Sequence, residues 1–302
     1  QPRLFLQDNS DLRAQIQYCG GMLLVVVCSN VHNFLDGIIL PAYLGLGALG
    51  MYIRPLVLGQ MIQVPYRAIT LISSPIIREA IVNNDLKKVK SMNQSIGLNL
   101  FLIGCFLFSL LVANAEGIFS LLPASYIVAK DVLYIIATGR LLDMAFGMNS
   151  EIINYSKYYK YIITLSVVMM IMTIGLNIWL IPIWGMNGAA LSVSISLVVF
   201  NILKTSIIYA KFGFHCFSKH YLTLLAISVF TIAVLHFIPF ITFVQHHMFF
   251  NACLNIIFKG VLGSLLFLVP TYGFAISSDL NHFIKLVLSG QLFKGGHRME
   301  NL

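Results

Sequence analysis

Apolar residues run along the chain in eight long stretches, and polar residues collect between them. Each stretch is near the ~20 apolar residues that a helix needs to cross the hydrocarbon core of a membrane. The runs are continuous and do not alternate from residue to residue as a membrane strand does. The pattern predicts an all-α integral membrane protein with about eight transmembrane helices, at residues 15–35, 50–76, 95–115, 131–149, 160–181, 186–209, 221–243 and 249–275.

The connections between these stretches are short on one side of the predicted membrane and basic on the other. The short, outer loops are centred on Leu44, Gly117, Trp184 and His246. With a cytoplasmic N-terminus, 14 of the 19 Lys and Arg residues fall on the inner side, among them Lys204, and Lys130 is the one in an outer loop. Because basic loops stay in the cytoplasm, we predict a multi-pass protein with both termini cytoplasmic.

Composition agrees with this assignment and excludes several classes of protein. Hydrophobic residues make up 58% of the 302 residues, charged residues make up 10%, and the mean hydropathy is +0.86. The net charge of +8 follows from basic inner loops that face anionic membrane lipids, so no nucleic acid is predicted as a partner. We find no nucleophile motif, cofactor loop or metal-binding spacing. We therefore predict no enzyme activity, no cofactor and no metal site.

The second stretch differs from a plain membrane anchor because it combines prolines with polar residues. Interior prolines remove backbone hydrogen bonds and bend a helix, and irregular backbone at membrane depth has to line a watery cavity or be buried in protein. We therefore predict a cavity wall here, with Arg67 and Arg54 as cavity cations. Arg54 lies near the outer end, so it can also reach the lipid headgroups. The polar residues and prolines are Arg54, Pro55, Gln60, Gln63, Pro65, Arg67 and Pro75.

Arg140 lies near the middle of the fourth stretch, and Asp143 follows on the same helical face. A charge at this depth requires a protein or water environment. Two interpretations remain open for the pair. It either neutralises itself and locks helix packing, or it opens when an anionic headgroup or a coupling cation arrives. We count Arg140 among the substrate-binding cations and Asp143 among the candidates for ion coupling or an ion pair.

Two more charges belong to this second group of candidates. Lys259 lies deep in the eighth stretch, where it is either packed against the bundle or available for an ion pair. Asp36 lies at the outer end of the first stretch, where it either marks the membrane boundary or binds a coupling ion. The small residues of the segment NGAALSVSIS, residues 187–196, predict close helix packing in lipid.

Two segments carry a resemblance to a known family. They are GALGMYIRPLVLGQMIQVPYRAITLISSPIIREAIVNNDLKKVK, residues 47–90, and LIPIWGMNGAALSVSIS, residues 180–196. Together they resemble the C-terminal portion of the polysaccharide-repeat-unit (O-antigen, Wzx-type) flippases of the multidrug/oligosaccharidyl-lipid/polysaccharide exporter superfamily.

This resemblance implies two six-helix lobes around a central cavity, with two further helices. We accordingly divide the chain into a cytoplasmic lead-in at 1–13, truncated from a longer chain, a six-helix lobe at 14–210, two additional helices at 211–275, and a cytoplasmic amphipathic helix and tail at 276–302. The first lobe would come from the missing N-terminal part or from a partner subunit.

The implied function is to flip undecaprenyl-pyrophosphate-linked oligosaccharide repeat units across the bacterial inner membrane by alternating access. Its partners would be this lipid-linked pyrophosphate and the membrane lipids. One alternative is a multidrug or cation antiporter of the same superfamily, which would use buried carboxylates. A membrane glycan polymerase or ligase is a weaker alternative, because the outer loops are short. A scaffold remains open if all buried charges are paired internally.

Overall fold

The structure is a computed structural model that describes residues 9–239, 248–274 and 276. Its described part contains helices and no strand. The predicted amphipathic helix in the segment 276–302 lies almost wholly outside the described residues, as does the outer loop at His246. The helices are α1 (Asn9–Gln60), η1 (Met61–Gln63), α2 (Val64–Val82), α3 (Leu86–Ala113), α4 (Ala115–Ser120), η2 (Ala124–Ala129), α5 (Lys130–Met144), α6 (Asn149–Tyr155), α7 (Tyr159–Phe212), α8 (His220–His236) and α9 (Met248–Gly273).

Four helices of the described chain are long and apolar enough to cross a membrane. They are the continuous run Gln15–Val82, the helix Leu86–Ala113, the helix Tyr159–Phe212 and the helix Phe249–Gly273. A fifth apolar helix, His220–His236, is shorter. The all-α class predicted from the sequence is confirmed for the described residues.

The two longest helices, α1 and α7, are each divided by a glycine. Gly45 has φ 80° and ψ 169°, and Gly185 has φ 57° and ψ −131°. An L-residue with a side chain rarely adopts a positive φ, so these two bends require glycine. Both bends are one residue away from predicted loop centres, Leu44 and Trp184. The chain therefore turns at both of these predicted positions.

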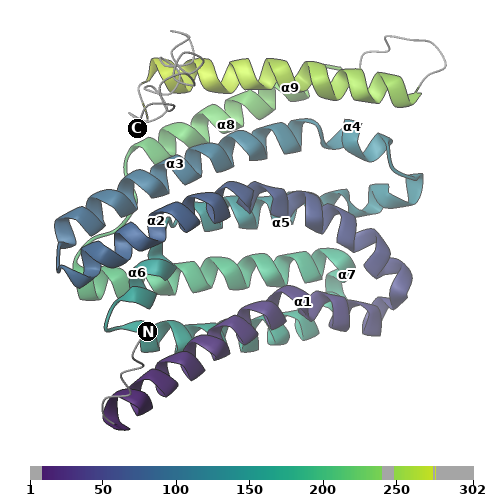
Figure 1. Cartoon of the computed structure of the whole chain (residues 1–302). Coiled ribbons are helices and arrows are strands. Elements are labelled where there is room, and N and C mark those ends of the chain that lie inside the picture. Colours follow the sequence, from purple (N-terminus) through teal and green to yellow (C-terminus); the bar gives the residue numbers. More distant parts are fainter. Residues whose placement is uncertain (1–8, 240–247, 275, 277–302) are drawn as a thin grey trace, which may run out of the picture.

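The bends turn α1 and α7 into pairs of neighbouring arms. In Figure 1 both bends lie at the end of the bundle that carries α4, opposite the end where α2 passes into α3. Helix α1 packs against α7 and α5, and α3 packs against α2, α5, α8 and α9. The two arms of α1 thus lie against α5 and α7, and α2 continues from them to pack against α3 and α6.

The predicted bend in the second stretch is present, and its position has a clear cause. The chain leaves α-helical geometry for one 3₁₀ turn, η1, just before Pro65, which lies in the first turn of α2. Pro65 has no N–H to donate to the carbonyl of Met61, and its ring would clash with that carbonyl in an α-helix. The tighter turn places Gln63 at the break between the two helices.

The predicted continuous helix at 131–149 is wrong. Helix α5 ends at Met144, and a turn with Gly147 at φ 60° separates it from α6. Fifteen residues of α-helix span about 22 Å, so α5 alone is shorter than the ~30 Å hydrocarbon core. Arg140 and Asp143 consequently lie in the last turns of α5, where we had expected the middle of a span.

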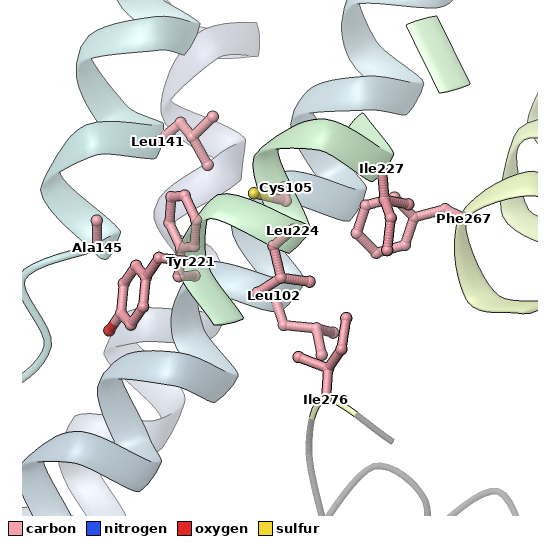
Figure 2. Packing of buried hydrophobic residues seen from close by; sticks show 10 residues of the cluster. Leu102, Cys105, Leu141, Ala145, Tyr221, Leu224, Ile227, Phe267 and Ile276 are labelled. Atoms are coloured by element: carbon pink, nitrogen blue, oxygen red, sulfur yellow. The ribbon is translucent and has the colours of Figure 1, made fainter. Parts of the chain in front are cut away.

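Helices α8 and α9 are attached to the rest of the bundle by an apolar core. The ring of Phe101 from α3 stacks on that of Tyr221 from α8, with 4.8 Å between centroids. Figure 2 shows Tyr221 and Leu224 of α8 between Leu141 of α5 and Phe267 of α9. The region that we predicted as two additional helices thus shares one core with α3 and α5.

The small residues of segment 187–196 allow the close packing that we predicted. A Cβ on Gly188 would lie 2.1 Å from the carbonyl oxygen of Leu180 on the other arm of α7. A Cβ on Gly139 of α5 would lie 2.5 Å from Oγ of Ser194. Larger side chains at these positions would push the two arms of α7, or α5 and α7, apart.

Candidate functional site

A cavity of about 490 Å³ opens between the two arms of α1, η1, α2 and α5. It brings together three of the predicted site residues, Arg67, Arg140 and Asp36, from distant parts of the sequence. Six of its thirteen lining residues are exposed, and five of these, including Phe34, belong to α1, so the cavity is open on the α1 side. Its lining residues are Asn30, Phe34, Asp36, Gly37, Leu49, Tyr52, Ile53, Leu56, Val57, Gln60, Gln63, Arg67 and Arg140.

The second arm of α1 and its continuation present one face to this cavity. The lining positions follow the three- and four-residue spacing of a helix face, from Leu49 to Arg67. Arg54 falls off this face and is not among the lining residues. Its guanidinium lies over the ring of Tyr126, 4.4 Å from the centroid. The structure therefore gives Arg54 a cation–π partner and places only Arg67 and Arg140 of the three predicted cations in the cavity wall.

Arg140 and Asp143 are joined through Gln63 and not directly. Nη1 of Arg140 donates a hydrogen bond to Oε1 of Gln63 at 2.9 Å, and Nε2 of Gln63 donates to Oδ2 of Asp143. Among the described residues, the one ion pair closer than 4.0 Å is Lys130–Glu116, on an outer connection. The direct Arg140–Asp143 pair, which we had kept open as a packing lock, is therefore not formed in this structure.

Asp143 is held by neutral donors on both sides. Nδ2 of Asn201 on α7 donates to its Oδ1 at 2.6 Å, opposite the bond from Gln63. The carboxylate lies in the last turn of α5, where the helix dipole disfavours a negative charge. Hydrogen bonds to an ionised carboxylate are among the strong ones, so the two amides offset that cost.

Asp36 lies inside the bundle, although we had also considered it a marker of the membrane boundary. Its side chain is only 2% exposed. It accepts hydrogen bonds from the hydroxyl of Tyr52, on the other arm of α1, and from Nδ2 of Asn177 on α7 at 3.1 Å. Oγ of Ser192 in turn donates to Asn177. One carboxylate thereby ties both arms of α1 to both arms of α7.

A further polar cluster lies between the cavity and the end of the bundle where α6 is found. The hydroxyl of Tyr66 donates to Glu151 at 3.2 Å. Lys204 donates to Oγ of Ser150 at 2.9 Å and lies over the ring of Phe200, 4.3 Å from its centroid. We had assigned Lys204 to a basic inner loop, but it belongs to α7 and is 5% exposed.

Lys259 lies apart from the cavity. It is 8% exposed on α9, a helix that packs against α8, α3 and α4. Asn251 and Asn255 precede it at four-residue intervals and are also buried, so one face of α9 carries a polar stripe toward the bundle. The structure brings Lys259 into contact with neither Arg67 nor Arg140.

The arrangement suits an anionic group better than a neutral one. Two guanidinium groups reach the cavity, and Asp36, the one carboxylate in its lining, already accepts hydrogen bonds from Tyr52 and Asn177. Arg140 is 7% exposed. Within the described chain, its guanidinium donates a hydrogen bond to the neutral amide of Gln63. Guanidinium groups bind phosphate oxygens in a bidentate manner. Phe34, Ile53 and Val57 add an apolar rim.

Sequence reasoning missed several polar partners of these charges. Tyr52, Asn177 and Asn201 were not singled out, since lone amides and tyrosines in apolar stretches are common. A usable signal existed for Asn177 and Asn201, because an amide inside a long apolar run has to find a hydrogen-bond partner within the protein. The identity of that partner could not be read from the spacing.

No protein-family model matches this sequence, and no curated protein matches it either. The resemblance described above therefore stays a prediction. A functional proposal therefore depends on the residues that line the cavity and not on similarity to known proteins.

Proposed function

We propose that this protein is a transporter that flips undecaprenyl-pyrophosphate-linked oligosaccharide repeat units across the bacterial inner membrane for surface polysaccharide synthesis. The observation that carries the proposal is the cavity whose wall contains both Arg67 and Arg140 in a bundle of apolar helices. A pyrophosphate needs cationic donors, and a polyprenyl chain needs an apolar path beside them. The cavity offers both, since its open side borders exposed apolar residues of α1.

The proposed topology has eight passes and two cytoplasmic ends. It rests on the bends at Gly45 and Gly185, which turn each of the two longest helices back on itself. Counted separately, the two arms of α1 (the second continued by α2) and the two arms of α7 give four passes. Helices α3, α5 with α6, α8 and α9 give four more. Lys87 and Lys88, in the first turn of α3, support a cytoplasmic position for the α2–α3 connection.

The open cavity supports the proposal of a second wall. Exposed apolar side chains from both arms of α1 line the cavity, namely Phe34, Ile53 and Val57. We propose that a second lobe, from a further part of the protein or from a partner subunit, faces this side and closes the cavity. Alternating access would then consist of the two walls rocking about the anion held between them.

The test is to replace each arginine in the full-length protein, in cells whose surface polysaccharide depends on it. Arg67→Ala and Arg140→Ala should each reduce polysaccharide export by about tenfold or more, because each variant loses a charge-assisted contact to the pyrophosphate. Arg54→Ala is the matched control, since Arg54 lies on the second arm of α1, which contributes to the cavity, but is not itself in the cavity wall. Normal export by both cavity variants at unchanged protein level would contradict the proposal.

A second candidate, a cation-coupled antiporter of small molecules, is favoured by one observation. Asp36 is a buried carboxylate in the wall of the same cavity, and such groups serve as coupling sites in transporters. Export of a cationic dye by membrane vesicles distinguishes the two. The antiporter would lose dye export in Asp36→Asn and keep it in Arg67→Ala, and the flippase would show no dye export at all.

A further inference from the structure

Arg140 and Asp143 are placed so that they could pair directly, yet a third side chain separates them. Residues three apart on an α-helix lie on the same face, where opposite charges attract. In this structure the amide of Gln63 lies between them, with its carbonyl toward the guanidinium and its NH₂ toward the carboxylate. The two charges thus fix the orientation of the amide, and the amide keeps the two charges apart.

We infer that Gln63 is a positioning residue that holds Arg140 away from Asp143 and so keeps its guanidinium available to an anion in the cavity. This inference rests on the proposed function and explains how Arg140 is kept free to bind the anionic substrate. A guanidinium has five N–H donors, and the bond to Gln63 uses one of them. A direct pair with Asp143 would instead take up two donors in bidentate geometry and cancel the charge.

The position of Gln63 is itself built into the helix break. It is the last residue of η1, the 3₁₀ turn that precedes Pro65. A 3₁₀ segment inside a long helix often marks a hinge. Gln63 contributes to the cavity wall and bonds to α5 at the same time. An anion that binds the other donors of Arg140 therefore lies next to the bond that links η1 to α5.

Asp143 does not need Arg140 for its own stability in this arrangement. Asn201 donates to one carboxylate oxygen at 2.6 Å, and Gln63 donates to the other. Removal of the Gln63 amide would leave one oxygen without that donor, and Arg140 is the nearest replacement on the same helix face. The expected result of losing Gln63 is thus a new Arg140–Asp143 ion pair and a weaker anion site.

The experiment measures binding of geranylgeranyl pyrophosphate to the detergent-solubilised full-length protein. Gln63→Ala should weaken binding by about tenfold, the scale of one strong interaction. Adding Asp143→Asn to that variant removes the competing carboxylate and should restore binding to within about threefold of wild type. Gln94→Ala, a glutamine on α3 that lies outside this cavity, should bind as wild type. Gln63→Met keeps the volume without the amide and repeats the test if the alanine variant does not fold.

The outcomes separate this inference from the proposed function. If Gln63→Ala and Gln63→Met bind the probe as wild type does, the inference is wrong. It is also wrong if Asp143→Asn fails to rescue them, since Gln63 would then act on structure alone. If Arg140→Ala binds as tightly as wild type, the proposed anion site itself is wrong, and the inference falls with it.

Discussion

The carboxylate of Asp36 and the side-chain amide of Asn177 are 141 residues apart in sequence and 3.1 Å apart in space. This bond joins α1 to α7 inside the bundle, beside the cavity that carries the proposed function. Both side chains are buried, so water cannot replace either partner.

We therefore expect Asn177→Ala to destabilise the protein. The variant leaves Oδ1 of Asp36 without this donor and also removes one of the two acceptors of Ser192, which keeps the carbonyl of Ala189. An unsatisfied buried polar group costs about 1–3 kcal/mol. Thermal unfolding in detergent measures the effect, with Ser206→Ala as the control on the same helix, because Ser206 is exposed and bonds only to a carbonyl of its own helix. Equal melting temperatures for the two variants would contradict the prediction.

The bend of α7 leads to a second prediction, at Gly188. A Cβ there would meet the carbonyl oxygen of Leu180 at 2.1 Å, and backbone on the opposite arm cannot move aside as a side chain can. Gly188→Ala should lower stability by about 3 kcal/mol or more.

Gly175→Ala provides the control for this variant. Gly175 lies in the same helix with no atom within 4 Å of an added Cβ. Alanine there should leave stability unchanged or raise it by about 0.5–1 kcal/mol. The yield of monodisperse protein and its melting temperature measure both variants. A stable, well-expressed Gly188→Ala protein would show that the two arms of α7 are not in close contact.

The proposed topology predicts opposite accessibility for two exposed positions. Ser125 in η2 should face the outside of the cell, and Lys157 between α6 and α7 should face the cytoplasm. In a background without native cysteines, a membrane-impermeant maleimide should label Ser125→Cys in intact cells. It should label Lys157→Cys only after permeabilisation. Labelling of both from the same side would overturn the eight-pass arrangement.

The native Cys216 should resist thiol reagents in the folded protein. It lies in the segment between α7 and α8 and is fully buried, and burial raises the pKa of its thiol to about 11. The thiolate, which is the reactive form, then amounts to less than about 1% between pH 7 and 8.5 and grows only as the pH rises toward 11. Maleimide labelling followed by mass spectrometry should find this cysteine modified after denaturation but not before. Fast labelling at pH 7.5 would contradict the burial.

The candidate site shows where local pattern is sufficient. Arg67 and Arg140 stood out because a cation inside an apolar run has to lie in a protein or water environment, and both line the cavity. Arg54 is also an arginine inside an apolar run, on the second arm of α1, but it faces Tyr126 instead. Whether an arginine points into the cavity depends on how its helix is rotated about its own axis. Because bends were expected at three prolines, residue spacing alone could not predict that rotation.

The depth of Arg140 shows where local pattern misleads. The apolar run 131–149 was long enough for one helix, but the turn at Gly147 ends α5 early and places Arg140 near its end. Hydropathy predicts that a run of residues is removed from water. It does not predict whether a glycine within that run has helical backbone angles or a positive φ that ends the helix.

The sequence by itself determined the all-helical class, the apolar stretches, the places where α1 and α7 turn, and two of the cavity cations. These features depend on hydropathy and on backbone freedom, which are properties of a few neighbouring residues. Only the tertiary structure decided that Gln63 separates Arg140 from Asp143, that Asp36 is bound to Asn177, and that Lys204 is buried. Each of these depends on how helices distant in sequence are rotated and packed, because a polar side chain in an apolar bundle bonds to whichever donor or acceptor that packing brings within about 3 Å.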